Sequence, residues 1–375
     1  MTPSNDTLRR AMRLMRAGDL QGATRTLQHA LGGAADVAPA RAANEACGDA
    51  IAAGPCIEGE FRVIDGGEAP SVQPRTRPGN GRSVRHAFSC DAGGLEYDLH
   101  VPAGLATAGA PLLLMLHGCT QTPEDFARGT RMNRLADAHG YVVAWPAQSP
   151  ARNQNRCWNW FRPGDQQRGR GEPAMLAALT GHLVASLQLD PDRVYVAGLS
   201  AGGAMAAVLA ATHPEVYAAI GVHSGLPVGL ASDVPSAFAA MRKGGGRRRH
   251  EAGAGSPGPV PAIVFHGDSD TTVHPGNGEG VVEQSLGHRE AAEGSARPAS
   301  VERDTAPGGR SSTRTVYLAP DGRVAAEHWV VHGAGHAWSG GDAGGSYTDP
   351  RGPDASAQML RFFDGCRRRA PARAR

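Results

Sequence analysis

The chain has 375 residues, of which 41% are hydrophobic, so it can bury one large core with an appended segment. Its formal net charge is only +2 at pH 7, which gives no global field that would favour binding to nucleic acid. The 6 cysteines follow no CxxC or CxxH spacing, which disfavours a zinc site, and no apolar run is long enough to span a bilayer.

Residues 1–82 are predicted to form an extension outside the core. Leu8, Met12 and Met15 begin a series of apolar residues at roughly helical spacing that continues to Leu31, which indicates one or two amphipathic helices. The residues that follow, to about Gly81, are rich in Ala, Gly, Pro and Arg and are typical of a poorly ordered linker. This segment is expected either to dock on a partner or to pack on the main domain.

Residues 83–366 are predicted to form one domain in which strands and helices alternate. The alternating pattern of residues 95–101 suits a half-exposed antiparallel strand, whereas the continuous apolar run 112–116 predicts a strand buried on both faces. Helices are expected at 126–139 and 173–187, and further strands at 141–145, 194–197, 219–222, 262–265 and 328–331. The pattern predicts an α/β fold with a mostly parallel sheet covered by helices on both faces, and an active site at the carboxyl ends of the strands. Two polar stretches, 243–259 and 286–314, are expected to be mobile surface loops.

The motif that organises the domain lies at residues 194–205, where an apolar run meets Gly-x-Ser-x-Gly and continues into an Ala-rich helix. This context predicts a nucleophile elbow that forces Ser200 into a strained backbone conformation and lifts its hydroxyl off the strand. A Cβ at Gly198 or Gly202 is expected to collide with the neighbouring strand or helix. The alternative is a glycine-rich turn with a solvated serine, since the chain contains 51 Gly.

A serine nucleophile needs a base, a group that orients the base, and donors for the oxyanion. Candidates follow in the chain order Ser, Asp, His that the elbow architecture requires. The predicted orienting acid is Asp270, which lies further out on the loop after the strand that ends at Phe265. Asp268 in the same loop is the alternative, and either carboxylate could instead merely cap the turn. His336, in a Gly-rich loop after the last strand, is the predicted base.

The oxyanion hole is predicted to use two backbone amides. One belongs to Ala201, directly after the serine, and the other to Cys119, in the loop after the buried strand. His117, at the end of that strand, is expected to support the loop through hydrogen bonds rather than to act as a base.

Five segments stand in order along the chain: LHGCTQ at 116–121, CWNWF at 157–161, GLSAGG at 198–203, HG at 266–267 with Asp270, and GHAW at 335–338. Together they resemble the polyhydroxybutyrate (PHB) depolymerase family of esterases, which also includes feruloyl and acetylxylan esterases. The resemblance covers roughly residues 84–363. It implies an α/β-hydrolase fold, no cofactor, and hydrolysis of short-chain polyester or carboxylic esters. The family roles fall on Ser200, Asp270 and His336, with Cys119 and Ala201 as oxyanion donors.

Many members of that family are secreted and carry a separate polymer-binding domain. Residues 1–20 lack the apolar core of a secretory signal, so the protein is expected either to stay inside the cell or to leave by another route. The expected partner is a polyester or a small ester substrate. The preferred substrate is PHB, as polymer or oligomers, and the alternative substrate is a feruloyl or acetylxylan ester. An alternative reaction is acyl transfer from the same acyl-enzyme.

Two further groups of residues have two interpretations each. Cys119 and Cys157 stand in loops that are expected to rim the active site, where they either form a disulfide or remain two free thiols. Trp158, Trp160 and Trp338 are predicted either to line an apolar substrate subsite or to pack at the rim and hold the loops. The arginine cluster 247–249 and the basic tail 367–375 are expected to be solvated, with contact to an acidic surface as the alternative.

Overall fold

The computed structural model describes residues 81–244, 258–287 and 298–368. The chain divides into two units, Met1–Arg75 and Thr76–Arg375, and the described residues belong to the second. The predicted N-terminal extension up to residue 80, the arginine cluster at 247–249 and the tail from residue 369 lie outside the described residues. Every helix within the described ranges is too short or too polar to cross a membrane.

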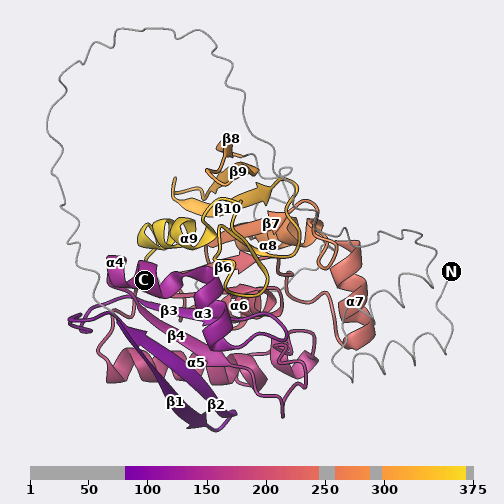
Figure 1. Cartoon of the computed structure of the whole chain (residues 1–375). Coiled ribbons are helices and arrows are strands. Elements are labelled where there is room, and N and C mark those ends of the chain that lie inside the picture. Colours follow the sequence, from indigo (N-terminus) through magenta and orange to yellow (C-terminus); the bar gives the residue numbers. More distant parts are fainter. Residues whose placement is uncertain (1–80, 245–257, 288–297, 369–375) are drawn as a thin grey trace, which may run out of the picture. The chain divides into compact units, whose positions relative to one another are not determined.

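A ten-stranded sheet forms the centre of the domain, in the order β1-β2-β4-β3-β5-β6-β7-β10-β9-β8 (Figure 1). The run of neighbouring strands from β4 to β10 is parallel, and β1, β2, β9 and β8 add antiparallel edges. The strands are β1 (Arg82–Cys90), β2 (Gly93–Val101), β3 (Leu112–Leu116), β4 (Val142–Ala147), β5 (Val194–Leu199), β6 (Ala219–His223), β7 (Ala262–Gly267), β8 (Ser300–Thr305), β9 (Ser311–Leu318) and β10 (Val324–Val331). The predicted mostly parallel α/β sheet is thus confirmed.

Helices cover both faces of this sheet (Figure 1). One core includes residues of α5 (Gly171–Ser186), α6 (Ala201–Thr212), α7 (Val234–Lys243) and α8 (Gly276–Leu286). The other includes residues of α3 (Pro123–Thr130), α4 (Met132–His139) and α9 (Ala355–Asp364). A short 3-10 helix, η1 (Pro163–Gln166), precedes α5, and β11 (Trp338–Ser339) pairs with β12 (Thr348–Asp349) in a separate small sheet.

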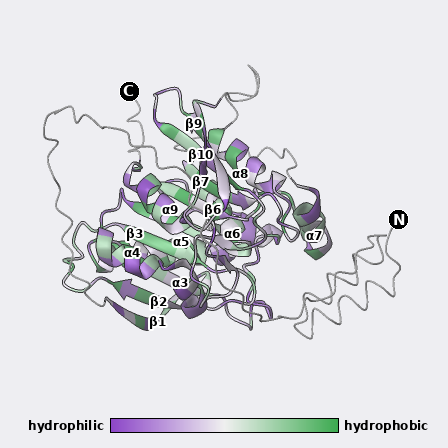
Figure 2. Ribbon diagram, turned by 45° about the horizontal axis from the view of Figure 1, so that its top comes forward, coloured by the Kyte–Doolittle hydropathy of each residue, from purple (hydrophilic) through white to green (hydrophobic). Residues whose placement is uncertain are grey.

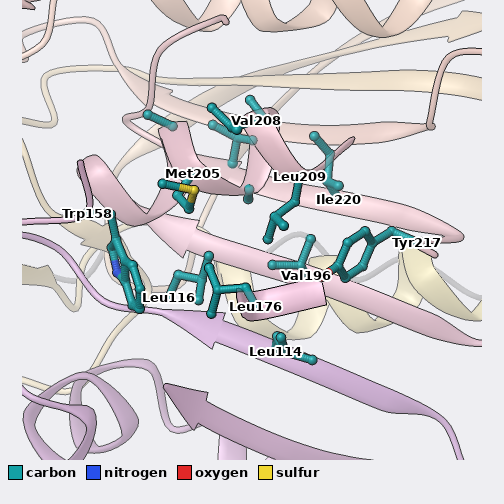
Figure 3. Packing of buried hydrophobic residues seen from close by; sticks show 14 of the residues in the cluster. Leu114, Leu116, Trp158, Leu176, Val196, Met205, Val208, Leu209, Tyr217 and Ile220 are labelled. Carbon is teal, nitrogen blue, oxygen red and sulfur yellow. The ribbon is translucent and has the colours of Figure 1, made fainter. Parts of the chain in front are cut away.

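The apolar runs of the sequence explain this layering. Because successive side chains of a strand point to opposite faces, Leu112, Leu114 and Leu116 enter one core while Leu113 and Met115 enter the other. Figure 3 shows the first of these cores, where Leu114 and Leu116 of β3 lie beneath α6. The mixed colours of β1 and β2 in Figure 2 reflect strands with one solvated face, as predicted for residues 95–101.

Two sequence-based expectations about elements are wrong. The helix expected over 126–139 is divided into α3 and α4 at Arg131, whose left-handed backbone (φ 56°) ends the first helix and precedes the second. The loop expected over 286–314 contains β8 and the start of β9, which pair with each other at the edge of the sheet. Their residues are largely polar because an edge hairpin is solvated, and its sequence therefore has the composition of a loop.

Candidate active site

Ser200 occupies the turn between β5 and α6 with φ 57° and ψ −118°. A positive φ is uncommon for a residue with a side chain, and this turn is held by hydrogen bonds on both sides. The Ser200 amide donates to the His223 carbonyl (2.9 Å), and its carbonyl accepts from the Ala204 amide (2.9 Å). The strained elbow expected from the sequence is therefore present.

Two glycines make this turn sterically feasible. A Cβ on Gly198 would lie 2.4 Å from the carbonyl carbon of Gly202, and a Cβ on Gly202 would lie 2.0 Å from the carbonyl oxygen of Leu116. Both contacts involve backbone atoms that cannot move aside, so the close approach of α6 to β3 and β5 requires glycine at both positions.

Asp270 and His336, which are 66 residues apart in sequence, are paired in space. The Nδ1 of His336 lies 2.7 Å from Oδ2 of Asp270, whose side chain is fully buried. The other carboxylate oxygen accepts the amides of Thr272 (2.9 Å) and Val273 (2.8 Å), which fixes the carboxylate plane. With Nδ1 bound to the carboxylate, the Nε2 atom of the imidazole is left to face a reacting group.

His266 belongs to the HG motif at 266–267 but had no predicted role, and it provides a second imidazole contact to Asp270. Its Nε2 donates to the Val273 carbonyl (2.9 Å) and lies 3.5 Å from the carboxylate oxygen that binds His336. Burial acts to raise the pKa of Asp270, but the contacts from His266 and His336 and the Val273 amide outweigh it and hold this pKa well below its usual range. Asp270 is therefore an anion at neutral pH.

Asp268, the competing carboxylate, binds a different part of the same loop. Its Oδ2 lies 2.9 Å from Nδ1 of His332, and its Oδ1 accepts the Gly333 amide at 2.7 Å. These contacts fasten the start of the loop that carries His336, and the Asp268 side chain is 39% exposed, in contrast to that of Asp270. Asp268 therefore anchors the start of the loop that carries His336, whereas Asp270 contacts His336 itself.

A buried neutral histidine, His223, holds the far end of the same loop. Its Nε2 accepts the Ser339 amide (2.9 Å), and its ring stacks between Phe265 and Trp338. Burial lowers the pKa of His223 to about 3, so it remains neutral and can accept this hydrogen bond at any ordinary pH.

The two predicted oxyanion donors lie in the segments that flank the serine. Within the described residues, neither the Cys119 amide nor the Ala201 amide donates a hydrogen bond to the protein. Ala201 begins α6, where the first amides of a helix have no intrahelical acceptor and carry a partial positive charge. Both amides are therefore available to a ligand oxygen.

A disulfide between Cys119 and Cys157 braces the loop after β3, with a Cα–Cα distance of 4.2 Å. Of the two interpretations of these cysteines, the structure has the disulfide rather than two thiols. The neighbouring Thr120 amide donates to the Asn155 carbonyl (2.7 Å), which ties the same two loops together. His117 lies behind them, where its Nε2 accepts the Gln148 amide at 3.2 Å and burial lowers its pKa to about 4.

The loop after β3 connects the serine to the histidine loop. A Cβ on Gly118 would lie 3.7 Å from the Cβ of Ser200, so this loop lies against the nucleophile position. On its other side, the hydroxyl of Thr120 is 3.4 Å from that of Tyr347, whose ring is 6.5 Å from the His336 ring. The Ser200 hydroxyl makes no hydrogen bond to any described residue, His336 included.

The tryptophans proposed as subsite residues are buried. Trp158 and Trp338 are 0% and 1% exposed, and Trp160 is 7% exposed. Figure 3 shows Trp158 beside Leu116 in the core, and Trp338 donates a hydrogen bond to Ser356 on α9. A ring without accessible surface cannot contact a ligand, so the substrate-binding expectation is wrong for Trp158 and Trp338, and packing that holds the loops is the interpretation that applies.

No cluster of His, Cys, Asp and Glu suited to a metal ion occurs in the described part of the chain. A cavity of about 800 Å³ is present at the opposite edge of the sheet, where Ala218, Val260 and Val324 lie near the starts of β6, β7 and β10. None of the candidate catalytic side chains lines it.

The chain is similar to known esterases. The profile of the family described as "Esterase PHB depolymerase" matches residues 95–305. The chain is 36% identical over 257 residues to poly(3-hydroxyalkanoate) depolymerase C of Paucimonas lemoignei, covering 66% of this chain and 60% of that protein. It is 31% identical over 283 residues to poly(3-hydroxybutyrate) depolymerase of Ralstonia pickettii (69% of this chain, 54% of the relative). It is 36% identical over 141 residues to feruloyl esterase B of Neurospora crassa (36% of this chain, 47% of the relative).

The chain therefore spans about half to 60% of the length of these curated relatives. Among solved structures, an acetyl xylan esterase from Aspergillus awamori matches with a TM-score of 0.60 and 20% identity, over 75% of this chain and 99% of that one. At this identity the likeness shows a shared fold.

Proposed function

This chain belongs to the PHB depolymerase family of esterases, and from that premise we propose that it is a serine esterase that hydrolyses short-chain polyhydroxyalkanoate, as polymer or oligomer, through an acyl-enzyme on Ser200. The observation that carries the proposal is the 2.7 Å contact between His336 and the buried Asp270, at the sheet edge where Ser200 stands on its strained turn. The edge is the one at which the carboxyl ends of the parallel strands meet.

In the first step, Nε2 of His336 takes the proton of Ser200 as the serine oxygen attacks the ester carbonyl. The carbonyl oxygen becomes an anion, which the amides of Cys119 and Ala201 stabilise through hydrogen bonds. When the tetrahedral intermediate collapses, the C–O bond to the alcohol breaks, and the alcohol leaves with the proton from His336.

In the second step, water attacks the acyl-enzyme while His336 again accepts a proton. The oxyanion forms at the same amides, and collapse returns the proton to Ser200 and releases the acid. Asp270 keeps a proton on Nδ1 and stabilises the imidazolium that forms transiently. Because Thr272, Val273 and His266 hold this carboxylate in place, no reorganisation is needed at the moment of reaction.

The substrate class is drawn from the relatives. Two of those compared are polyhydroxyalkanoate depolymerases by name, and they align with 66% and 69% of this chain. Feruloyl and acetylxylan esterases also match, over 36% and 55% of the chain, which supports a feruloyl or acetylated-sugar ester as the second candidate. The larger aligned share favours the polyester.

The proposal is tested by assaying poly-3-hydroxybutyrate, soluble 3-hydroxybutyrate oligomers, methyl ferulate and acetylated xylan side by side, with Ser200→Ala as the blank. We expect the highest kcat/KM on the oligomers and no turnover by the variant. Preferential cleavage of methyl ferulate or acetylated xylan would replace the polyester with the second candidate. Addition of a competing alcohol distinguishes transfer from hydrolysis, because a transferase would yield the new ester as its main product.

A further inference from the structure

Tyr347 is an exposed aromatic residue at the candidate active site that no motif of the sequence singled out. It lies between β11 and β12, and 45% of its surface is exposed. Among the large hydrophobic residues exposed in the described part of the chain, it is the one in ring contact with a candidate catalytic residue. Trp158 and Trp338 offer no such surface, whereas Tyr347 presents an accessible aromatic ring beside His336.

The backbone of Tyr347 is held in an uncommon conformation. Its φ is 52°, a value that bulky residues rarely adopt unless the surrounding structure imposes it. Its carbonyl accepts the Trp338 amide (2.7 Å), and the preceding residue, Ser346, donates its amide (2.9 Å) and its hydroxyl to the Asp125 carboxylate. Gln121 also donates to the Ser346 carbonyl (3.1 Å), so Tyr347 is fastened to the same loop that carries the Cys119 amide.

The side chain extends between the two loops that deliver the base and the oxyanion donor. Its ring meets the His336 ring edge to face, at a centroid distance of 6.5 Å and an angle of 79°. Its hydroxyl lies 3.4 Å from Oγ1 of Thr120. Because the Thr120 hydroxyl donates to the Cys119 carbonyl (2.6 Å), the proton between the two hydroxyls comes from Tyr347. A hydrogen bond of this length is weak, so a ligand oxygen can replace it.

We infer that Tyr347 is a specificity-determining residue. Its ring forms one wall of the substrate site, and its hydroxyl donates a hydrogen bond to an ester carbonyl one repeat away from the bond that is cleaved. The ligand is an oligomeric hydroxyalkanoate, whose carbonyl oxygens recur along an apolar chain and match a phenol that offers an apolar face and one donor. This inference rests on the proposed function. A simple monoester has no second carbonyl and gains the ring contact alone.

The test compares kcat/KM on the methyl ester of the 3-hydroxybutyrate trimer with kcat/KM on p-nitrophenyl butyrate. Loss of one hydrogen bond corresponds to about a 2- to 10-fold change, so in Tyr347→Phe the ratio of the two values should fall by about that factor. In Tyr347→Ala the ratio should fall further, with a rise in KM for the trimer, because the wall is lost as well. Tyr317→Phe, which removes a phenol hydroxyl from β9, is the matched control and should leave the ratio within about twofold.

Equal losses on both substrates in Tyr347→Phe would leave the ratio unchanged and would mean that the residue only positions His336. Unchanged kcat/KM values on both substrates would mean that the hydroxyl contacts no substrate. Either result overturns the inference. A fluorophosphonate probe separates this failure from failure of the proposed function. If the probe modifies Ser200 in the wild type and the ratio does not change, the inference alone is wrong. If the wild type is neither modified nor active on either substrate, the proposed function is wrong and the inference fails with it.

Discussion

Asp270→Asn should abolish most of the activity while the protein stays folded. In the wild type, Oδ1 of Asp270 accepts two loop amides, at 2.8 and 2.9 Å, and Oδ2 faces His336. Asparagine has one acceptor oxygen, and the two amides will hold it on their side. The NH2 group of the asparagine then faces Nδ1 of His336 and forces that atom to accept a hydrogen bond. The imidazole proton moves to Nε2, where it blocks proton removal from Ser200.

The expected cost follows from this change of tautomer. In serine hydrolases of known mechanism, the same substitution of the orienting acid lowers kcat by about 10⁴, and we expect a loss of about 10³ to 10⁴ here. This loss corresponds to about 4 to 5.5 kcal/mol of transition-state stabilisation, at about 1.36 kcal/mol for each factor of ten. KM should change little, because Asp270 is buried behind the imidazole and has no surface for a substrate.

The matched control is Asp268→Asn, in the same loop and also paired with a histidine, His332, at 2.9 Å. It should keep kcat within a few-fold, and the partial exposure of this pair limits the loss of stability to about 1 kcal/mol. The assay is kcat and KM on p-nitrophenyl butyrate at pH 8, with thermal unfolding recorded for both variants. Retention of more than about a tenth of wild-type kcat in Asp270→Asn, or an equal loss in Asp268→Asn, would refute the assignment of the orienting acid.

Three further perturbations address stability. Cys119→Ser with Cys157→Ser opens a link between residues separated by 38 positions, and should lower the free energy of unfolding by up to about 4 kcal/mol; an unchanged Tm would contradict this. Gly202→Ala places a Cβ 2.0 Å from a backbone oxygen and should prevent soluble folding. In contrast, Gly181→Ala lies in open space on α5 and should raise the free energy of unfolding by about 0.5–1 kcal/mol. Equal yields of soluble protein from the two variants would contradict this prediction. Acid should destabilise the fold because three buried histidines have a pKa far below that of an unfolded histidine, about 6.5. They are His117 (pKa about 4), His223 (about 3) and His328 (about 4). The unfolded state binds these three protons as the pH falls below about 6.5, so the free energy of unfolding should fall by up to about 4 kcal/mol per pH unit between about pH 6 and pH 4; a flat urea-denaturation profile over this range would contradict it.

Much of the fold could be predicted from local sequence. The run 112–116 is apolar at every position because β3 is covered on both faces, and a strand of that kind has no alternation to misread. The elbow could be predicted for a different reason, since Gly198 and Gly202 are required by backbone contacts that any such turn makes. In both cases the constraint leaves a mark on the local sequence itself, as a continuous apolar run or as glycines at fixed positions.

Other features depend on contacts that local sequence does not contain. The edge strands β8 and β9 are polar because one side of the hairpin meets solvent, so composition indicated a loop. The burial of Trp158 and Trp338 depends on which elements cover them, and an aromatic residue near a motif gives no indication of its exposure. Tyr347 had no signal at all, because its place beside His336 follows from the pairing of β11 with β12 and from the contacts of Ser346 with Asp125.

The choice between Asp268 and Asp270 shows the same limit at the site. Both carboxylates follow β7 in the sequence, and Asp270 is the predicted orienting acid because it lies further along the loop. The structure adds that each carboxylate meets its own histidine, His332 or His336, and that only the second pair is shielded from solvent on its acidic side. The two carboxylates are distinguished by contacts to histidines that lie 64 and 66 residues further along the chain, and no sequence-spacing rule predicts such contacts.

The most direct test of the nucleophile is covalent labelling by a fluorophosphonate probe, with the modified peptide identified by mass spectrometry. We expect a single adduct on Ser200 in the wild type, none in Ser200→Ala, and labelling slowed by at least about a hundredfold in His336→Ala, since general-base assistance contributes about 10²- to 10⁴-fold. Persistent labelling of Ser200→Ala, or labelling of the wild type at another residue, would contradict a hydrolytic mechanism at this serine.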